Sequence, residues 1–251
     1  MVKSKGTGLR HLRRSSSPEF WPILRKEYVW TVNPSPGPHS KDRCIPIGII
    51  IRDLLGYART MREARRVLGE GKVKVDGRIV RDYKFPVGLM DVVEIVPSGE
   101  TYRVVPHPVK HMVLHPIPKD EASFKLLRIE GKTIVKGRAV QLHFHDGRNH
   151  LLKDPSEDVF KTYDVVKMTI PKQEIIDHIK FEEGVLAVVI AGRNIGKVGR
   201  VVDVKKVFKT ANALVTMESD GESFRTILDY VFVIGMEEPL ITLPEYGGEK
   251  S

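Results

Sequence analysis

The segment AGRNIGKVGRVVDV, residues 191–204, contains the residue types that a phosphate-binding loop uses: glycines followed by a Gly-Lys pair. Such a loop needs four residues between its first glycine and the Gly-Lys pair, and then a Ser or Thr that holds magnesium. Here three residues separate Gly192 from Gly196, and Val198 follows Lys197. The next residues are β-branched and favour a strand, whereas a phosphate would need a helix N-terminus. The spacing therefore excludes an NTP-binding loop at this segment.

The segment HFHDGRNHLL, residues 143–152, contains residue types that could bind a metal ion. His143 and His145 would share one face of a strand, with Asp146 and His150 close by. Zinc sites need three or four such ligands in a defined geometry, usually with cysteines or an H-E-x-x-H helix. The chain has one cysteine, and HDGRN suits a hairpin turn. We interpret the segment as a strand and a turn, and we predict no metal, no cofactor and no catalytic residue.

Cations on a helix and a following hairpin offer a different chemistry, the neutralisation of phosphates. The spacing predicts a first helix in IPIGIIIRDLLGYA, with Pro46 in its first turn, and a second helix that begins with a Thr60–Glu63 capping box and ends at Gly71. The second helix has an apolar face and a basic face. These faces carry Met61, Ala64, Val67 and Leu68 on one side, and Arg62, Arg65 and Arg66 on the other.

The segment KVKVDGRIV after the second helix predicts a hairpin with Asp76-Gly77 at its turn. Lys72, Lys74 and Arg78 would lie on its exposed side, and the only acidic residues interleaved with the six cations would be Glu63 and Asp76. A basic helix face is more often only solvated, but the adjacent basic hairpin favours a surface for an RNA or DNA backbone.

The charge of the chain is concentrated in its first half. Residues 1–111 carry 21 Lys and Arg against 11 Asp and Glu, while residues 112–251 carry 20 against 21. This asymmetry is typical of proteins that bind a polyanion, although it also fits a merely soluble basic protein. No apolar run is long enough to span a membrane, and the N-terminus lacks the apolar region of a secretory signal. We expect a soluble intracellular protein with no membrane partner.

The fold class that the pattern predicts is α+β and multidomain. We expect an extended basic arm at 1–42 that becomes ordered only on its partner, although Trp21 and Trp30 argue against a purely disordered arm. A unit of two helices and a β-hairpin at 43–97 follows, then a β-rich central domain at 98–175. Four to five short strands at 176–235 fit a small barrel, and residues 236–251 form an acidic, solvated tail.

Two stretches resemble known RNA-binding modules. Residues 43–96, with REARRVLGEGKVKVDGRIV, resemble the alpha-L RNA-binding module, and residues 183–217 resemble a KOW motif, a glycine-centred hairpin within an SH3-like barrel. Together with the arm HLRRSSSPEFWPI and with LHFHDGRN, KTYDVV and HIKFEEG, their order is similar to the archaeal and eukaryotic (e-type) family of small-subunit ribosomal protein four, over essentially the whole chain. The C-terminal end is shorter and less basic than in eukaryotic members, which indicates an archaeal-type protein.

The resemblance implies a cytoplasmic structural constituent of the small ribosomal subunit that binds its rRNA, supports assembly and translation, contacts neighbouring ribosomal proteins and takes no small-molecule substrate. The rRNA-binding residues that it implies are Arg10, His11, Arg13, Arg14, Arg62, Arg65, Arg66, Lys72, Lys74, Arg78, Arg193, Asn194, Lys197 and Arg200. Glycines 192, 196 and 199 would let the backbone approach RNA, or would simply serve the hairpin.

Two alternatives remain open. The first is an RNA-modifying enzyme that carries an alpha-L module, but the chain has no Gly-Arg-Leu-Asp stretch of a pseudouridine synthase and no cofactor loop of a methyltransferase. The second is a KOW-containing translation or transcription factor that visits ribosomes transiently, and this class the sequence does not exclude.

Overall fold

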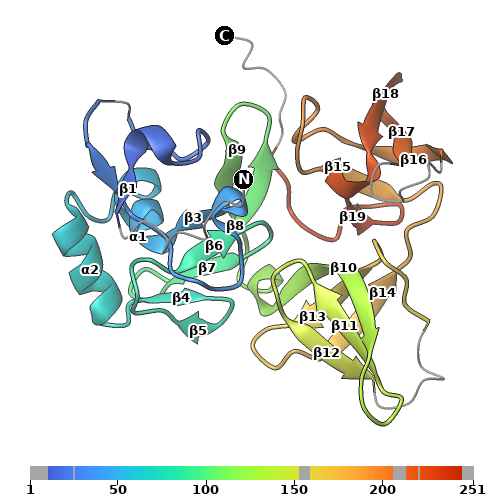
Figure 1. The fold of residues 1–251 in the computed structure, drawn as a ribbon, viewed down its shortest axis with the longest axis horizontal. Helices are drawn as coiled ribbons and strands as arrows, with labels where there is room; N and C mark the ends of the chain where they lie inside the picture. Colours follow the sequence, from blue (N-terminus) through green and yellow to red (C-terminus); the bar gives the residue numbers. More distant parts are fainter. Residues whose placement is uncertain (1–10, 25, 153–158, 206–212, 220, 245–251) are drawn as a thin grey trace, which may run out of the picture.

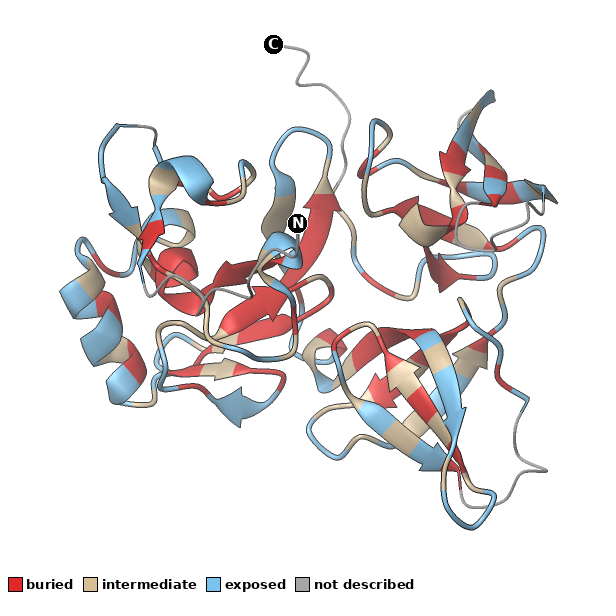
Figure 2. Ribbon diagram, in the orientation of Figure 1, coloured by how far each residue is buried: buried red, intermediate tan, exposed pale blue. Residues whose placement is uncertain are grey.

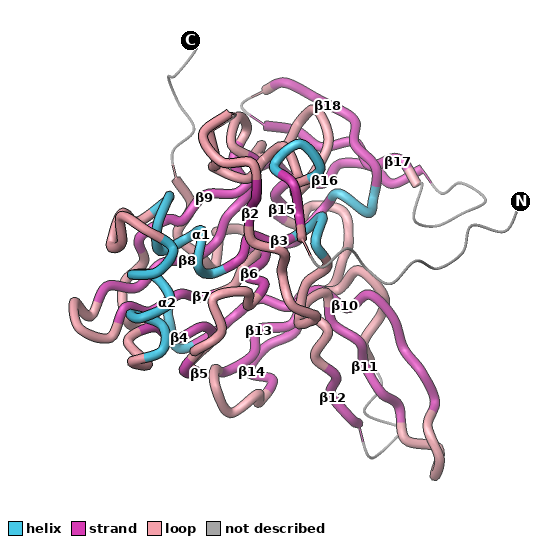
Figure 3. Tube along the Cα trace, turned by 60° about the vertical axis from the view of Figure 1, so that its left-hand side comes forward, coloured by secondary structure: helices cyan, strands magenta, loops and turns pink. Residues whose placement is uncertain are grey.

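The computed structural model describes residues 11–24, 26–152, 159–205, 213–219 and 221–244. Within them, three five-stranded antiparallel sheets follow one another along the chain, and the helical segments at 47–54 and 61–69 lie beside the arm at one end of the molecule (Figures 1 and 3). The first sheet has the strand order β5-β4-β7-β8-β9, the second β12-β11-β10-β13-β14 and the third β18-β17-β16-β15-β19.

The strands of the first sheet are β4 (Val73–Val75), β5 (Arg78–Ile79), β7 (Val92–Ile95), β8 (Glu100–His107) and β9 (His111–Pro116). Those of the second are β10 (Phe124–Ile134), β11 (Val140–Phe144), β12 (Asn149–Leu152), β13 (Val165–Thr169) and β14 (Ile175–Ile179). Those of the third are β15 (Leu186–Val189), β16 (Val198–Lys205), β17 (Leu214–Ser219), β18 (Glu222–Ile227) and β19 (Val231–Gly235). Two further pairs are β1 (Leu12–Arg13) with β2 (Trp30–Thr31), and β3 (Cys44–Pro46) with β6 (Pro86–Gly88).

The first predicted helix is shorter than the sequence pattern suggested. Helical geometry is confined to α1 (Ile47–Ile49) and a π-helical turn, η3 (Ile50–Leu54), while Pro46 is the N-cap and not a residue of the first turn. The reason is that Cys44, Ile45 and Pro46 form β3, which pairs with β6 and withdraws these residues from the helix. The isoleucines of this segment are buried in the core although the helix itself is short.

The second predicted helix is confirmed as α2 (Met61–Gly69). Its capping box is complete, because the Thr60 hydroxyl accepts from the Glu63 N–H while the Glu63 carboxylate accepts from the Thr60 N–H. Ala64 and Leu68 are fully buried against the first sheet's core, which leaves the opposite face of the helix to solvent (Figure 2). The hairpin turn at Asp76-Gly77 is also present, with positive φ at both residues and strands β4 and β5 on either side.

Two sheets extend across positions where the pattern placed a domain boundary. Strands β8 and β9 follow the predicted boundary after residue 97, but β8 pairs with β7 and β9 pairs with β8 in the first sheet. Strand β14 overlaps the predicted start of the barrel at residue 176, but it pairs with β13 in the second sheet. Pairing partners that are distant in the sequence determine these assignments, and local strand patterns do not contain that information.

The arm is packed against the rest of the protein wherever it is described, in contrast to the expectation that it gains order only on a partner. Trp21 is 2% exposed and its indole N–H donates to the Cys44 carbonyl at 2.7 Å. Leu12 and Ile23 are buried in the same core as α1 and α2. Burying these apolar side chains offsets the entropy of ordering the proline-rich segment that follows them.

Residues 236–244 also differ from the solvated tail that was expected. Ile241 is 2% exposed in the core of the third sheet, and Thr242 donates from both its N–H and its hydroxyl to the Glu121 carboxylate, at 3.1 and 2.6 Å. Glu121 in turn forms an ion pair with the fully buried Arg103. The acidic composition of this stretch favoured a solvated tail in the sequence analysis, but its apolar residues, such as Ile241, pack into the core. Residues 245–251 lie outside the described part.

A buried cluster of charges joins the first two sheets; we call it the Lys125 cluster. The Lys125 ammonium on β10 contacts the carboxylates of Asp76 and Asp146 at 3.0 Å each, as well as that of Asp91. Lys125 and these carboxylates are at most 5% exposed. Burial would lower the pKa of Lys125, but the carboxylates outweigh it and raise that pKa above its usual range.

Candidate nucleic-acid interface

The exposed face of α2 carries the arginines that the sequence pattern predicted. Arg62, Arg65 and Arg66 are all exposed, because the 3.6-residue period turns them away from buried Ala64 and Leu68. Arg65 lies 4.0 Å from the centre of the Tyr83 ring, which orients its guanidinium over an aromatic face. The helix therefore presents a row of cations to solvent, as a phosphate-binding surface requires.

The expectation that this surface contains no further acidic residue is wrong. Glu70 lies 3.1 Å from the Arg66 guanidinium and 2.6 Å from the Lys72 ammonium, and Glu94 lies 3.1 Å from Lys74. The hydrogen bonds from Lys72 and Arg66 lower the pKa of Glu70, so this carboxylate stays ionised. Three of the six predicted cations are thus paired within the protein. Arg62, Arg65 and the exposed Arg78 on β5 carry no such carboxylate contact among the described residues.

The arm contributes two of its four predicted residues to an exposed surface. His11 and Arg13 are exposed and surround the Trp30 ring, with the His11 ring centre and the Arg13 guanidinium carbon each 5.6 Å from its centroid. Arg14 is half-buried and donates to the Ile23 carbonyl at 2.8 and 3.1 Å, so its guanidinium links two parts of the arm. Arg10 lies outside the described residues.

The arm and the helices enclose a hollow of about 550 Å³, which we call the arm–helix groove. It is lined by His11, Leu12, Tyr28, Trp30, Thr31, Val32, Asn33, Arg52, Thr60, Met61, Arg65, Tyr83 and Lys84. The structure therefore brings the predicted arm residue His11 and the predicted helix residue Arg65 to the walls of one groove.

The turn between β15 and β16 is a strand connection, as the sequence pattern predicted, and it lies in the third sheet, on the far side of the molecule from α2 (Figure 1). Arg193 and Lys197 are exposed, Asn194 is half-buried, and Arg200 on β16 is exposed and reaches the Glu237 carbonyl at 3.2 Å. These cations therefore form a second basic region, separate from the one at α2.

Backbone conformation and packing within the protein explain why glycine occupies these positions of the turn. Gly192 and Gly196 both have a φ of +83°, and a Cβ at Gly196 would lie 2.7 Å from the Pro108 side chain. A Cβ at Gly199 would lie 2.6 Å from the Glu218 carbonyl oxygen on β17. Since intramolecular packing requires the absence of a side chain here, the structure favours the hairpin interpretation of these glycines over an approach to RNA.

The histidine-rich segment forms the β11–β12 hairpin with HDGRN at its turn, as predicted. The His143 ring contacts the Asn149 amide oxygen at 2.6 Å and the Thr133 hydroxyl at 2.8 Å. His145 points inward, and burial together with the charge of Lys125 lowers its pKa to about 3. Among the described residues, no three His, Cys, Asp or Glu side chains are placed to hold a metal ion.

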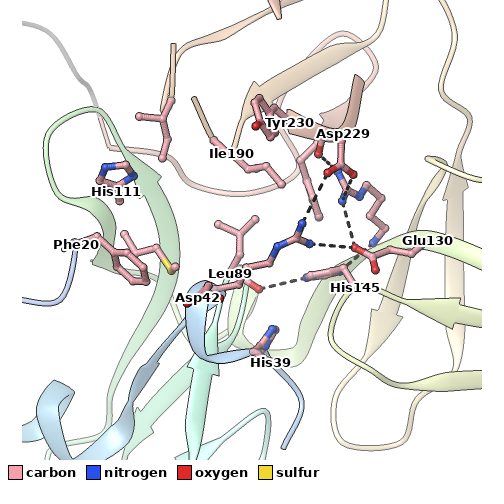
Figure 4. A pocket seen from close by; sticks show the side chains of 16 residues that line it. Phe20, His39, Asp42, Leu89, His111, Glu130, His145, Ile190, Asp229 and Tyr230 are labelled. Carbon is pink, nitrogen blue, oxygen red and sulfur yellow. Dashed lines mark hydrogen bonds and ion pairs between the residues drawn. The ribbon is translucent and has the colours of Figure 1, made fainter. Parts of the chain in front are cut away.

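A smaller hollow of about 250 Å³ lies where the arm and all three sheets meet (Figure 4). Its polar wall is occupied by contacts between its own side chains. The Arg128 guanidinium lies 3.2 Å from the Glu130 carboxylate and 3.6 Å from that of Asp229, and it donates to the Asp229 carbonyl at 2.8 Å. This hollow marks the junction of the structural units.

No helix in the described part of the chain is long and apolar enough to cross a membrane.

A two-helix unit with an exposed arginine face, followed by a basic hairpin on a β-sheet, defines the class of the protein: it carries an RNA-binding S4 (alpha-L) module. Comparisons with known proteins agree, because residues 54–93 match the S4 domain, residues 7–42 the RS4NT domain and residues 98–175 Ribosomal family S4e. The chain is 54% identical to the small ribosomal subunit protein eS4 of Staphylothermus marinus and 52% identical to that of Aeropyrum pernix. Each comparison covers 95% of this chain, with 97% and 96% of the respective relatives.

The chain belongs to the S4e family of ribosomal proteins. It is therefore a ribosomal protein and not an enzyme. A crystal structure of the 30S ribosomal protein S4e from Thermoplasma acidophilum is similar, with a TM-score of 0.67 and 39% identity over 78% of this chain and 96% of that one.

The sequence pattern did not single out several residues that the structure places in the walls of the arm–helix groove. Tyr28, Arg52 and Lys84 line the arm–helix groove, and Trp30 was noted only as an argument against disorder. The closely spaced aromatics in EYVWT were the available signal, since a solvated segment seldom needs two large rings.

Proposed function

We propose that the protein is a structural constituent of the small ribosomal subunit, in the cytoplasm, held there by small-subunit rRNA and by neighbouring ribosomal proteins. The observation that carries this proposal is the exposed face of α2, where Arg62 and Arg65 extend from a helix whose other face is fixed in the core. Such a rigid row of guanidinium groups neutralises phosphates and releases their counterions. Relatives named small ribosomal subunit protein eS4, at about half identity over nearly the full length, support the same assignment.

We also propose five functional units: arm 1–42, alpha-L module 43–97, central domain 98–175, KOW or SH3-like barrel 176–235 and C-terminal segment 236–251. These units follow the sequence resemblance, whereas the first and second sheets continue across the bounds at 97 and 175. The third sheet supports the barrel, because it has five short antiparallel strands, of which β15 and β16 are joined by the glycine-containing turn at Gly192 and Gly196. Arg193, Asn194, Lys197 and Arg200 would contact rRNA there, as a region separate from α2.

The proposal is tested by the stoichiometry of the protein in small subunits pelleted through a high-salt wash. We expect about one copy per subunit. Loss of most copies would overturn the structural role and leave a factor that visits ribosomes transiently.

A second measurement tests the α2 surface itself. In binding of the purified chain to small-subunit rRNA, Arg62→Gln should reduce the slope of log K against log salt by about one unit, since it removes one phosphate contact. Lys136→Gln is the matched control, because Lys136 is exposed in the β10–β11 hairpin of the second sheet. Equal slopes for both variants would contradict the proposal that α2 contacts the rRNA.

A further inference from the structure

We propose that the arm–helix groove is a binding site for unpaired rRNA nucleotides, whose bases stack on Trp30 and Tyr28 while their phosphates face Arg65 and Lys84. The inference rests on the proposed function and deepens it, because it names the form of RNA that this face accepts and a set of aromatic contacts. Phosphate contacts alone would hold any nucleic acid of suitable shape, whereas stacking needs bases that are free of a helix.

The first observation is the exposure of two large aromatic rings beside buried ones. Trp30 is 55% exposed and Tyr28 is 41% exposed, although Trp21 in the same arm is 2% exposed. The arm therefore buries one indole, that of Trp21, and leaves the other exposed. Trp30 is held at the surface because it pairs with Arg13 between β1 and β2. An indole that is fixed by a short strand pair and is more than half exposed is a preformed stacking platform.

The second observation is the pairing of aromatic rings with cations around the groove. The guanidinium carbon of Arg52 lies 4.8 Å from the centre of the Tyr28 ring, and the Arg13 and Arg65 guanidiniums lie over the Trp30 and Tyr83 rings. Planar guanidiniums and aromatic faces are the two kinds of surface on which unstacked bases are held. Arg52 also forms an ion pair with the neighbouring Asp53 at 2.9 Å and its side chain is 13% exposed, so its charge is partly compensated and it supports the Tyr28 ring.

The third observation is the sign of the charge. The described residues that line the groove include Arg52, Arg65 and Lys84 but no Asp or Glu. The junction hollow is the opposite case, because Asp42, Glu130 and Asp229 line it beside its arginines. A polyanion is therefore complementary to the arm–helix groove and not to the junction hollow.

The form of the RNA follows from the location of the rings. In an A-form duplex the base faces are covered by their neighbours, so such a duplex reaches a protein through phosphates and 2′-hydroxyls. Rings set in the walls of a groove of about 550 Å³ fit bases that have been turned out of a helix. The groove also brings His11 of the arm and Arg65 of α2 to its walls, which lets one strand of RNA contact both elements.

The test uses the full chain and measures affinity by titration at fixed salt. The probes are small-subunit rRNA, a ten-nucleotide single-stranded RNA and a ten-base-pair RNA duplex. Trp30→Ala should weaken single-strand binding roughly 5- to 150-fold, the range that loss of one stacked base produces. Trp30→Phe should retain most of the affinity, because a benzene ring still stacks. Val29→Ala is the matched control, since Val29 is the adjacent residue and is 70% exposed.

Each outcome separates the groove from the broader function. If Trp30→Ala and Val29→Ala bind the single strand equally well, or if duplex and single strand bind the wild-type chain alike, the groove is not a site for unpaired bases. If the wild-type chain fails to bind small-subunit rRNA in any form, the proposed function fails instead. Preserved rRNA binding together with a loss confined to Trp30→Ala supports the inference.

Discussion

Replacing Lys125 with methionine should strongly destabilise the protein. Methionine nearly preserves the volume of the side chain but removes the ammonium that contacts Asp76, Asp91 and Asp146, all of them buried. Removing one partner from a buried ionic cluster costs about 3–5 kcal/mol, because the three carboxylates would keep only Arg148, beside Asp76 and Asp146, and His39, beside Asp91. For a chain of this length, such a loss lowers the Tm by about 6–20 °C.

The assay is thermal unfolding of the full chain between pH 7 and pH 4. Burial would raise the pKa of Asp91 and of Asp146, but the charges of His39, Lys125 and Arg148 outweigh it and hold both pKa values below the usual range. Each carboxylate therefore stabilises the wild-type fold above a pH of about 4, and this stabilisation is lost as the pH falls through the folded-state pKa.

Without Lys125 the same carboxylates are easier to protonate in the fold, so the deficit of the variant should shrink as the pH falls from 7 toward 4. Lys136→Met is the control, because Lys136 is exposed and the same substitution there should change the Tm by little. A Lys125→Met protein within about 1 kcal/mol of wild type at pH 7, or a deficit that does not depend on pH, would refute the reasoning.

Three further predictions concern single positions. Gly196→Ala should lower the stability by more than about 1 kcal/mol in urea unfolding, because φ is +83° and the new Cβ would meet Pro108; a neutral effect would mean that this turn is free to move. Thr60→Ala should cost about 0.5–2 kcal/mol in the same assay by removing the acceptor for the Glu63 N–H, whereas Thr60→Ser should be close to wild type. Cys44 should resist alkylation at pH 8 in the native protein and react in urea, because burial, and then the carboxylates of Asp91 and Asp42, raise the pKa of its thiol to about 12; rapid native labelling would contradict this.

The local features of the fold could be predicted from the sequence. The Thr60–Glu63 spacing located the start of α2, and Asp76-Gly77 located the hairpin turn, because caps and tight turns depend on a few neighbouring residues. The glycine-bounded turn between β15 and β16 was predictable for the same reason.

The long-range features were not predictable from the same patterns. Asp76 and Asp146 each precede a glycine, which is typical of exposed turns. Both are nevertheless buried, with their carboxylates in contact with the Lys125 ammonium. Arg14 is of a residue type that often binds phosphates, but its guanidinium donates to the Ile23 carbonyl within the arm. Whether a charged side chain faces solvent or a buried partner depends on which strands meet, and this is decided far from the residue in sequence.

The hydrogen bonds between Thr242 and Glu121 also have a consequence for biosynthesis. A chain released after Gly235 would contain all the strands of the third sheet, but the Glu121 carboxylate would lack both donors from Thr242 while its other oxygen stayed next to Arg103. Leaving such a buried acceptor unsatisfied costs about 1–3 kcal/mol. A prematurely terminated product would therefore resemble the finished protein in secondary structure and still open more readily at this junction.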